Sequence, residues 1–300
     1  MYKLLLVVLA AGILSCQSDD GTEPWTKHLQ NADRASKSKK FERAQIELRT
    51  ALELLEKAPE ARRTHTRVLA AIARLQGRKR EFAGAESLFE TAIDMQLKDL
   101  EAGGVVTSAD LIADIGQLAF IKNQQQEYAV AESLLTRILT LQRQGLVSLE
   151  PFEPGYYALF SMMAGSLRGR GLTAEADSLD ALAITYQHYA HGFGTRANGN
   201  YPEAQGHYLN ALSTGESVLG AGHPDIALFY SDLSAVYSMQ GRDDQALEVL
   251  QKAVLILEQQ DDSTALNVAL EDLASTLERL NRMVEAQSTR DRIAPSNTLR

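Results

Sequence analysis

Apolar residues recur at intervals of three and four positions along most of the chain. One stripe holds Leu69, Ile72 and Ala73, a second runs through residues 85–92, and Gly77 marks a turn region between them. Because an α-helix has 3.6 residues per turn, this spacing places the apolar side chains on one helix face. The pattern therefore predicts pairs of amphipathic helices joined by short turns.

A short phrase that ends in alanine opens the second helix of each predicted pair. It consists of a bulky residue or a turn, two or three polar positions and then alanine, and it occurs seven times, ending at Ala44, Ala85, Ala131, Ala176, Ala204, Ala246 and Ala286. The successive spacings are 41, 46, 45, 28, 42 and 40 residues. We expect six to seven helix–turn–helix repeats over residues 25–294 and a tail over residues 295–300. At the step of 28 residues, two helices either abut or merge.

The phrase and its period resemble the tetratricopeptide repeat (TPR). The residues that carry the resemblance best are His188, His191, Gly192, Tyr201, Ala204, Tyr208 and Ala211. The period near 41 and the segment Gly222-His223-Pro224-Asp225-Ile226-Ala227 are similar to the longer repeats of kinesin light chains. The resemblance implies an all-α fold, a TPR-type α-solenoid whose repeats stack in a right-handed superhelix. One departure is that the fifth copy has no aromatic residue before Ala176.

The first sixteen residues have the organisation of an export signal. Met1-Tyr2-Lys3 is followed by an uncharged apolar run over residues 4–14. As a helix this run rises only about 16 Å, which is short of a hydrocarbon core of roughly 30 Å. Its end, Ile13-Leu14-Ser15-Cys16, resembles the lipobox of bacterial lipoproteins. The resemblance implies a signal peptide over residues 1–15, lipidation of Cys16 and a polar tether over residues 16–24. The alternative is an ordinary secretory signal with an incidental cysteine.

The residues after Cys16 bear on the location. Gln17-Ser18-Asp19-Asp20 resembles the acidic export signal of surface lipoproteins of Bacteroidota. We expect a lipid-anchored protein of the bacterial outer membrane that is exposed at the cell surface or, alternatively, on the periplasmic face.

Composition narrows the chemistry. The single cysteine excludes a disulfide framework and multi-cysteine metal sites, and the formal charge of −9 argues against a nucleic-acid partner. The phosphate-binding, dinucleotide-binding and serine-hydrolase motifs are absent, so we expect no catalytic residues, no cofactor and no enzymatic activity. His188, His191 and His207 could share a zinc ion, but we interpret them as packed core residues and expect no metal.

The first helix of each pair lines the concave groove in repeats of this kind. The groove positions that this predicts are Arg67, Arg74, Arg78, Tyr186, Tyr189, Phe193 and Arg196. Arginine suits carboxylates and aromatic rings anchor interfaces, so the partner is expected to be a protein or an extended peptide. The alternative is that these side chains only cover a solvent face.

Charge is distributed unevenly between the two ends of the chain. Residues 25–100 carry 16 Lys and Arg against 11 acids, whereas residues 101–300 carry 13 against 25. The basic third could be attracted to an anionic lipid or polysaccharide surface, although a solvated helix surface explains it equally simply.

The function that these features favour is a lipid-anchored, non-enzymatic scaffold for protein–protein interactions at the bacterial outer membrane. One alternative is an assembly or quality-control component of that membrane. Another is a surface lipoprotein that captures carbohydrates or nutrients, with Tyr186, Tyr189 and Phe193 stacking on sugar rings.

Overall fold

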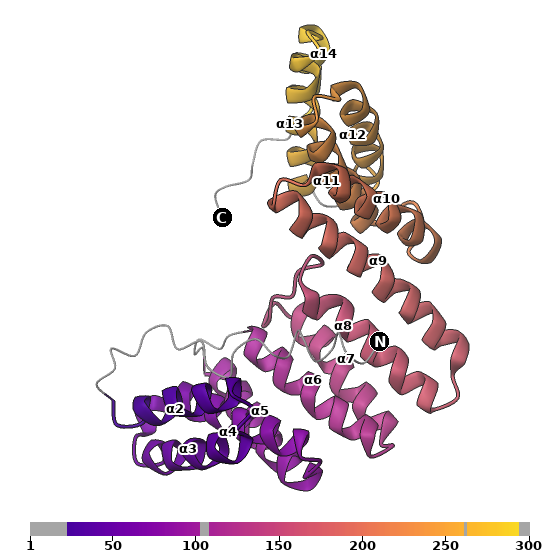
Figure 1. Ribbon diagram of the computed structural model, residues 1–300. Helices are drawn as coiled ribbons and strands as arrows, with labels where there is room; N and C mark the ends of the chain where they lie inside the picture. Colours follow the sequence, from indigo (N-terminus) through magenta and orange to yellow (C-terminus); the bar gives the residue numbers. More distant parts are fainter. Residues whose placement is uncertain (1–22, 103–107, 261–262, 294–300) are drawn as a thin grey trace. The chain divides into compact units, whose positions relative to one another are not determined.

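The computed structural model describes residues 23–102, 108–260 and 263–293 (Figure 1). The expected signal peptide, Cys16 and the tail over residues 295–300 lie outside these ranges. The described residues form α-helices and one short 3-10 helix, and they contain no strand. The helices are α2 (Thr26–Lys37), α3 (Phe41–Leu55), η1 (Pro59–Ala61), α4 (Arg62–Arg78), α5 (Phe82–Glu101), α6 (Ser108–Gln124), α7 (Tyr128–Arg143), α8 (Pro154–Gly169), α9 (Thr173–Ala197), α10 (Tyr201–Val218), α11 (Pro224–Met239), α12 (Asp243–Leu257), α13 (Ser263–Arg279) and α14 (Met283–Arg290).

The helices belong to two compact units. Among the described residues, the first unit comprises those up to residue 149 together with 162–176, and the second comprises 150–161 and those from residue 177 onward, so α8 and α9 contribute to both. Within the described ranges, no helix combines the length and the apolar character needed to cross a membrane.

Each alanine of the repeated phrase occupies the same place in its helix. It is the fourth residue of α3, α5, α7, α9, α10, α12 and α14. All seven alanines are buried, with at most 1% of their surface exposed. An alanine there lets the partner helix approach closely, because a larger side chain would hold the two backbones apart.

The turn before each of these helices is also the same in all seven copies. The residue five positions before the alanine has a positive φ in every copy: Lys39, Arg80, Gln126, Gly171, Gly199, Gly241 and Asn281. The next residue donates its backbone N–H to the carbonyl five residues before it, over 2.8–3.0 Å. This is the hydrogen bond of a left-handed helix C-cap, which ends one helix and turns the chain back.

The short alanine spacing corresponds to a single helix. Of the two alternatives that the sequence left open, the structure has merged helices: α9 runs unbroken over 25 residues. Its start follows the turn at Gly171, and its end precedes the turn at Gly199. It therefore serves as the second helix of one pair and the first helix of the next.

The core of the second unit is rich in aromatic residues. Tyr189, Tyr208 and Phe229 are among the largest fully buried side chains. The ring centroids of Tyr189 and Phe229 are 4.5 Å apart, and those of Tyr189 and Tyr208 are 5.8 Å apart. These contacts connect α9 to α10 and α11.

Candidate functional site

The arginines predicted to line a basic groove on α4 are largely engaged within the first unit. Arg74 Nη2 lies 2.7 Å from Asp114 Oδ1, and Arg67 Nε lies 3.6 Å from Asp110 Oδ2, both on α6. Arg78 is exposed and lies over the Phe41 ring, with its Cζ 5.4 Å from the ring centroid. The structure therefore corrects the expectation of a free basic groove, because two of the three guanidinium groups pair with the next repeat.

Asp114 is the centre of a polar network between three helices. The residue is 1% exposed, and Gln96 Nε2 of α5 donates a hydrogen bond of 2.8 Å to its second carboxylate oxygen. Burial raises the pKa of Asp114 to about 6, although Arg74 and Gln96 act in the opposite direction. The network holds α4, α5 and α6 together, and the Asp114 side chain at its centre is shielded from solvent.

Tyr186 and Tyr189 do not face a groove, which is a second correction. They are 2% and 1% exposed, and their hydroxyl groups donate hydrogen bonds to Asp225 and Asp232 of α11. The bond from Tyr189 to Asp232 measures 2.6 Å. Because both rings are buried, they cannot stack on a sugar, and the structure gives no support to carbohydrate capture by these rings.

Phe193 and Arg196 remain half-buried at the end of α9. The Phe193 ring stacks on Phe152, with centroids 4.3 Å apart and an angle of 14° between the planes. The Arg196 Cζ lies 5.2 Å from the centroid of Phe193, and its Nη1 lies 3.2 Å from Asp232 Oδ1. Of the four residues predicted on α9, only these two have an accessible edge.

Three histidines gather where α9 meets α10. The ring of His207 lies 5.9 Å from that of His188 and 5.4 Å from that of His191, measured between centroids. His191 is exposed and the other two are half-buried, so the interpretation as core histidines is wrong for His191. Burial lowers the pKa of His188 and of His191, which favours neutral rings. Among the described residues, no group of three or more histidine, cysteine or carboxylate side chains has the geometry of a metal site.

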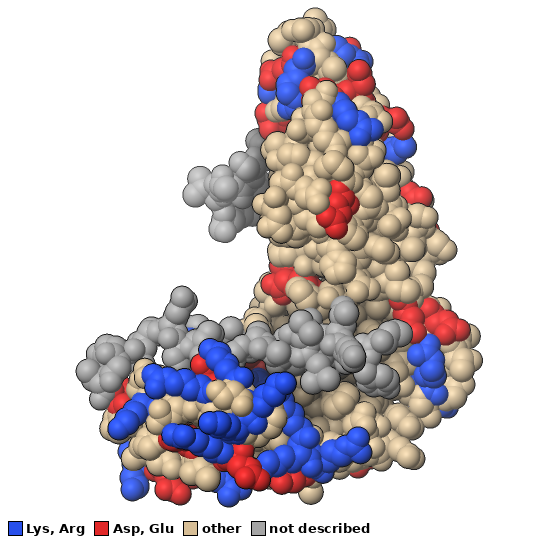
Figure 2. Space-filling model, viewed as in Figure 1, with Lys and Arg blue, Asp and Glu red and all other residues tan. Residues whose placement is uncertain are grey.

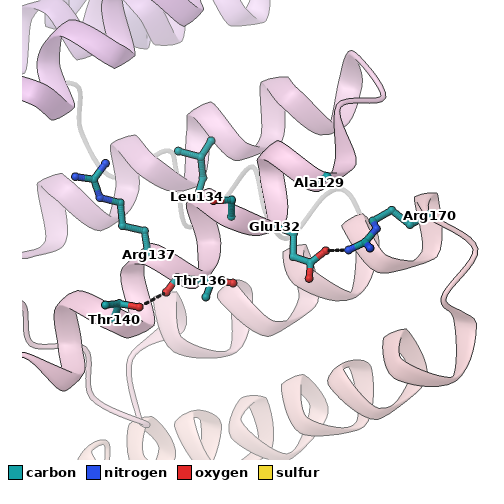
Figure 3. Close-up of a pocket in the computed structure, with 8 residues that line it drawn as sticks. Ala129, Glu132, Leu134, Thr136, Arg137, Thr140 and Arg170 are labelled. Atoms are coloured by element: carbon teal, nitrogen blue, oxygen red, sulfur yellow. Dashed lines mark hydrogen bonds and ion pairs between the residues drawn. The ribbon is translucent and has the colours of Figure 1, made fainter.

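An open cleft of about 550 Å³ lies along α7, next to the end of α8 (Figure 3). Its lining consists of Ala129, Glu132, Ser133, Leu134, Thr136, Arg137, Thr140 and Arg170. Glu132 pairs with Arg170, which follows α8, and the Thr140 hydroxyl donates to the Thr136 carbonyl over 3.1 Å. Arg137 is exposed and makes no hydrogen bond or ion pair with another described residue.

The cleft combines one available guanidinium group with side-chain hydroxyl groups on the same helix face. Ser133, Thr136, Arg137 and Thr140 are three or four positions apart, which places them side by side on α7. This arrangement can bind a carboxylate, since guanidinium and hydroxyl groups both donate to it. This cleft was not among the predicted sites, although the same three- and four-residue spacing of polar residues in the sequence could have indicated a polar stripe.

The family model that matches this chain is that of the tetratricopeptide repeat, over residues 182–259. That range holds the end of α9 together with α10, α11 and α12. Tetratricopeptide repeats therefore occupy this part of the chain, and the resemblance read from the sequence is confirmed, as is the all-α fold of helix–turn–helix repeats. The right-handed sense of the superhelix stays a prediction.

Several solved structures are similar to this chain at low sequence identity. A Podosopora anserina protein with nearly identical TPR-like repeats of the kinesin light chain type is 19% identical, covers 60% of this chain and 91% of its own, and has a TM-score of 0.33. BtubC (BKLC) from P. vanneervenii is 16% identical over 91% of this chain and 95% of its own, with a TM-score of 0.33. A tetratricopeptide repeat protein of Parabacteroides merdae is 13% identical over 91% and 94%, with a TM-score of 0.40. No curated protein sequence matches this chain.

Proposed function

Since its residues 182–259 are tetratricopeptide repeats, we propose that this protein is a non-enzymatic scaffold that binds a protein or peptide partner. The observation that carries the proposal is the uniform helix-pair architecture, in which all seven turns and all seven alanines repeat one geometry. Such arrays expose long helix faces and serve as binding surfaces.

The cleft on α7 is the surface that we assign to the partner. Arg137 can donate two parallel hydrogen bonds to a carboxylate without breaking an existing ion pair. Thr136 adds a hydroxyl donor beside it, and Ala129 and Leu134 offer apolar contact (Figure 3). Ser133, four positions before Arg137 on α7, adds a second hydroxyl donor. A peptide with an acidic side chain or a free carboxyl terminus, next to small apolar residues, matches this lining.

We also propose that the scaffold is anchored by lipid on Cys16 at the bacterial outer membrane. The support is the resemblance of Ile13-Leu14-Ser15-Cys16 to a lipobox and the fact that this cysteine is the only one in the chain. The acidic residues after it favour the cell surface, and the periplasmic face is the alternative. Replacing Cys16 with Ser should abolish the incorporation of labelled palmitate into the protein. Undiminished labelling of the Ser variant would contradict the anchor.

The partner site can be tested by affinity capture from detergent-solubilised membranes with the full-length chain. Arg137→Glu reverses the charge in the cleft, and Arg143→Glu makes the same change on α7 outside the cleft lining. Both side chains are exposed, so neither variant should unfold the protein. We expect a partner that is captured by the parent and by Arg143→Glu but lost at least tenfold by Arg137→Glu. Equal capture by both variants would place the partner elsewhere, and no specific partner at all would contradict the scaffold.

A further inference from the structure

The first two repeat turns place basic residues in a backbone conformation that favours glycine. Lys39 has φ 57° and Arg80 has φ 62°, at the position that Gly171, Gly199 and Gly241 occupy in later turns. The left-handed region is unfavourable for a residue with a Cβ atom, and Lys and Arg are not among the residues that tolerate it best. The chain therefore keeps a positive charge at two positions where glycine would fit the backbone better.

Lys39 and Arg80 do not stabilise the fold through contacts of their own. Both side chains are exposed, and neither makes a hydrogen bond or an ion pair with a described residue. Packing and pairing therefore do not explain why these two positions are basic.

The two turns lie next to each other, so their charges combine. Lys79 Nζ of the second turn donates a hydrogen bond of 3.0 Å to Gln45 Oε1 on α3, just after the first turn. Arg78 lies over the ring of Phe41, the first residue of α3. We call the basic side chains of these two turns the basic edge: Lys37, Lys39, Lys40, Arg78, Lys79 and Arg80.

Few acidic groups oppose the basic edge. Lys37 pairs with Asp33 at 2.6 Å, and Glu42 and Glu81 are exposed beside the turns. Figure 2 shows Lys and Arg side chains gathered over the segment from α2 to α5, whereas the whole chain has a formal charge of −9. On a protein that is acidic overall, an anionic partner attracts the locally positive surface and repels the rest, so this surface turns toward the partner.

We propose that the basic edge docks on the surface of an anionic phospholipid bilayer. The inference rests on the proposed lipid anchor in one respect, which is that an anchor at Cys16 keeps this part of the chain near a membrane. The start of α2 at Thr26 is ten positions after Cys16, a reach of at most about 35 Å. Docking through the edge fixes one side of the first unit against the lipid headgroups and leaves the cleft on α7 to the partner.

The test uses the full-length chain with Cys16→Ser, so that no attached lipid contributes to binding. Its partitioning onto vesicles of phosphatidylcholine with 30% phosphatidylglycerol is compared with that onto vesicles of phosphatidylcholine alone. The ratio of the two partition coefficients isolates the charge effect, because the apolar residues 4–14 bind both kinds of vesicle. Lys39→Gly/Arg80→Gly removes two charges, and Gln126→Gly/Asn281→Gly makes the same backbone change at two uncharged turns.

We expect Lys39→Gly/Arg80→Gly to lower this ratio roughly 25-fold, at about fivefold per charge near an anionic surface. The same variant should unfold at a urea concentration equal to or higher than the parent, because glycine relieves the left-handed turns. Gln126→Gly/Asn281→Gly should leave the ratio unchanged. If Lys39→Gly/Arg80→Gly lowers the ratio of partition coefficients and unfolds at no lower urea concentration than the parent, unfolding does not explain the lower ratio.

Three results would overturn the docking proposal. They are an equal affinity of the parent for both kinds of vesicle, an unchanged ratio in Lys39→Gly/Arg80→Gly, and an equal loss in the uncharged control. None of these outcomes depends on whether Cys16 is lipidated or on the cleft at Arg137, so the scaffold and its anchor fail or stand by their own tests.

Discussion

Gly192 should be a position on α9 that tolerates no side chain. A Cβ atom there would lie 3.0 Å from Cδ1 and Cε1 of Tyr208 and 3.2 Å from its Cγ. The Tyr208 ring is fully buried and packs beside Tyr189, so it has little room to move away. Gly194, two positions further along the same helix, is exposed and would place its Cβ atom more than 4 Å from any neighbour. The two glycines therefore form a matched pair.

Two opposing terms set the expected size of the effect. Alanine is more favourable than glycine inside a helix by about 1 kcal/mol, and this gain applies at both positions. Overpacking a buried contact costs about 1–3 kcal/mol, and this cost applies only at Gly192. Gly194→Ala should therefore raise the free energy of unfolding by about 1 kcal/mol, and Gly192→Ala should lower it by about 1 kcal/mol.

Urea unfolding of the full-length chain, followed by far-UV circular dichroism, measures both variants. Repeat arrays can unfold in stages, so amide hydrogen exchange in α9 and α10 supplies the local free energy. The double variant Gly192→Ala/Tyr208→Leu vacates the space that the new methyl group needs, and the cost of Gly192→Ala should disappear in that background. If Gly192→Ala stabilises the protein as much as Gly194→Ala, the close packing of α9 on the Tyr208 ring is refuted.

Two further predictions concern buried polar groups. Asp114→Ala should lower the free energy of unfolding by about 2–4 kcal/mol, because it leaves Arg74 without its buried partner. Folding raises the pKa of Asp114 from 3.8 to about 6, so the protonated carboxyl group favours the folded state. This stabilisation is lost as the pH rises through 6. Urea unfolding between pH 4 and 7 should therefore show a pH-dependent free energy of unfolding in the parent, and Asp114→Ala should lack this contribution. Tyr189→Phe should cost about 1–2 kcal/mol, because it removes a hydrogen bond and leaves Asp232 with one donor fewer. Tyr208→Phe should cost nothing, because that hydroxyl is buried and has no hydrogen-bond partner among the described residues. Equal thermal unfolding midpoints for the two Phe variants would contradict this account.

The helix pairs and their turns could be predicted because their determinants are local. A buried alanine at the fourth position of a helix and a left-handed residue five positions earlier are both set by a few neighbouring residues. The length of the step between Ala176 and Ala204 showed that it is irregular, since 28 residues leave no room for a complete additional pair of helices. The length alone did not decide between abutting and merged helices, which the unbroken α9 settles.

The pairing partners of the predicted groove residues are not local, and local sequence patterns therefore did not predict that these residues are paired. Arg74 meets Asp114 at a separation of 40 residues, and Tyr189 meets Asp232 at a separation of 43 residues. Both separations are close to one repeat period. A search for opposite charges or hydrogen-bond partners one period apart would have identified these contacts before the structure was known.

The merged helix explains why the tyrosines of α9 are buried. A first helix of an ordinary pair leaves one face free for a ligand, but α9 is also the second helix of the preceding pair and packs on both sides. The Tyr186 ring lies 4.6 Å from Tyr156 of α8 and 6.1 Å from Phe229 of α11, measured between centroids. Since helices on two sides enclose this ring, it offers no face to a ligand. A ligand site must then use helices with a free face. The helix α7 meets that condition, because its exposed Arg137 makes no ion pair with any residue that the structure describes.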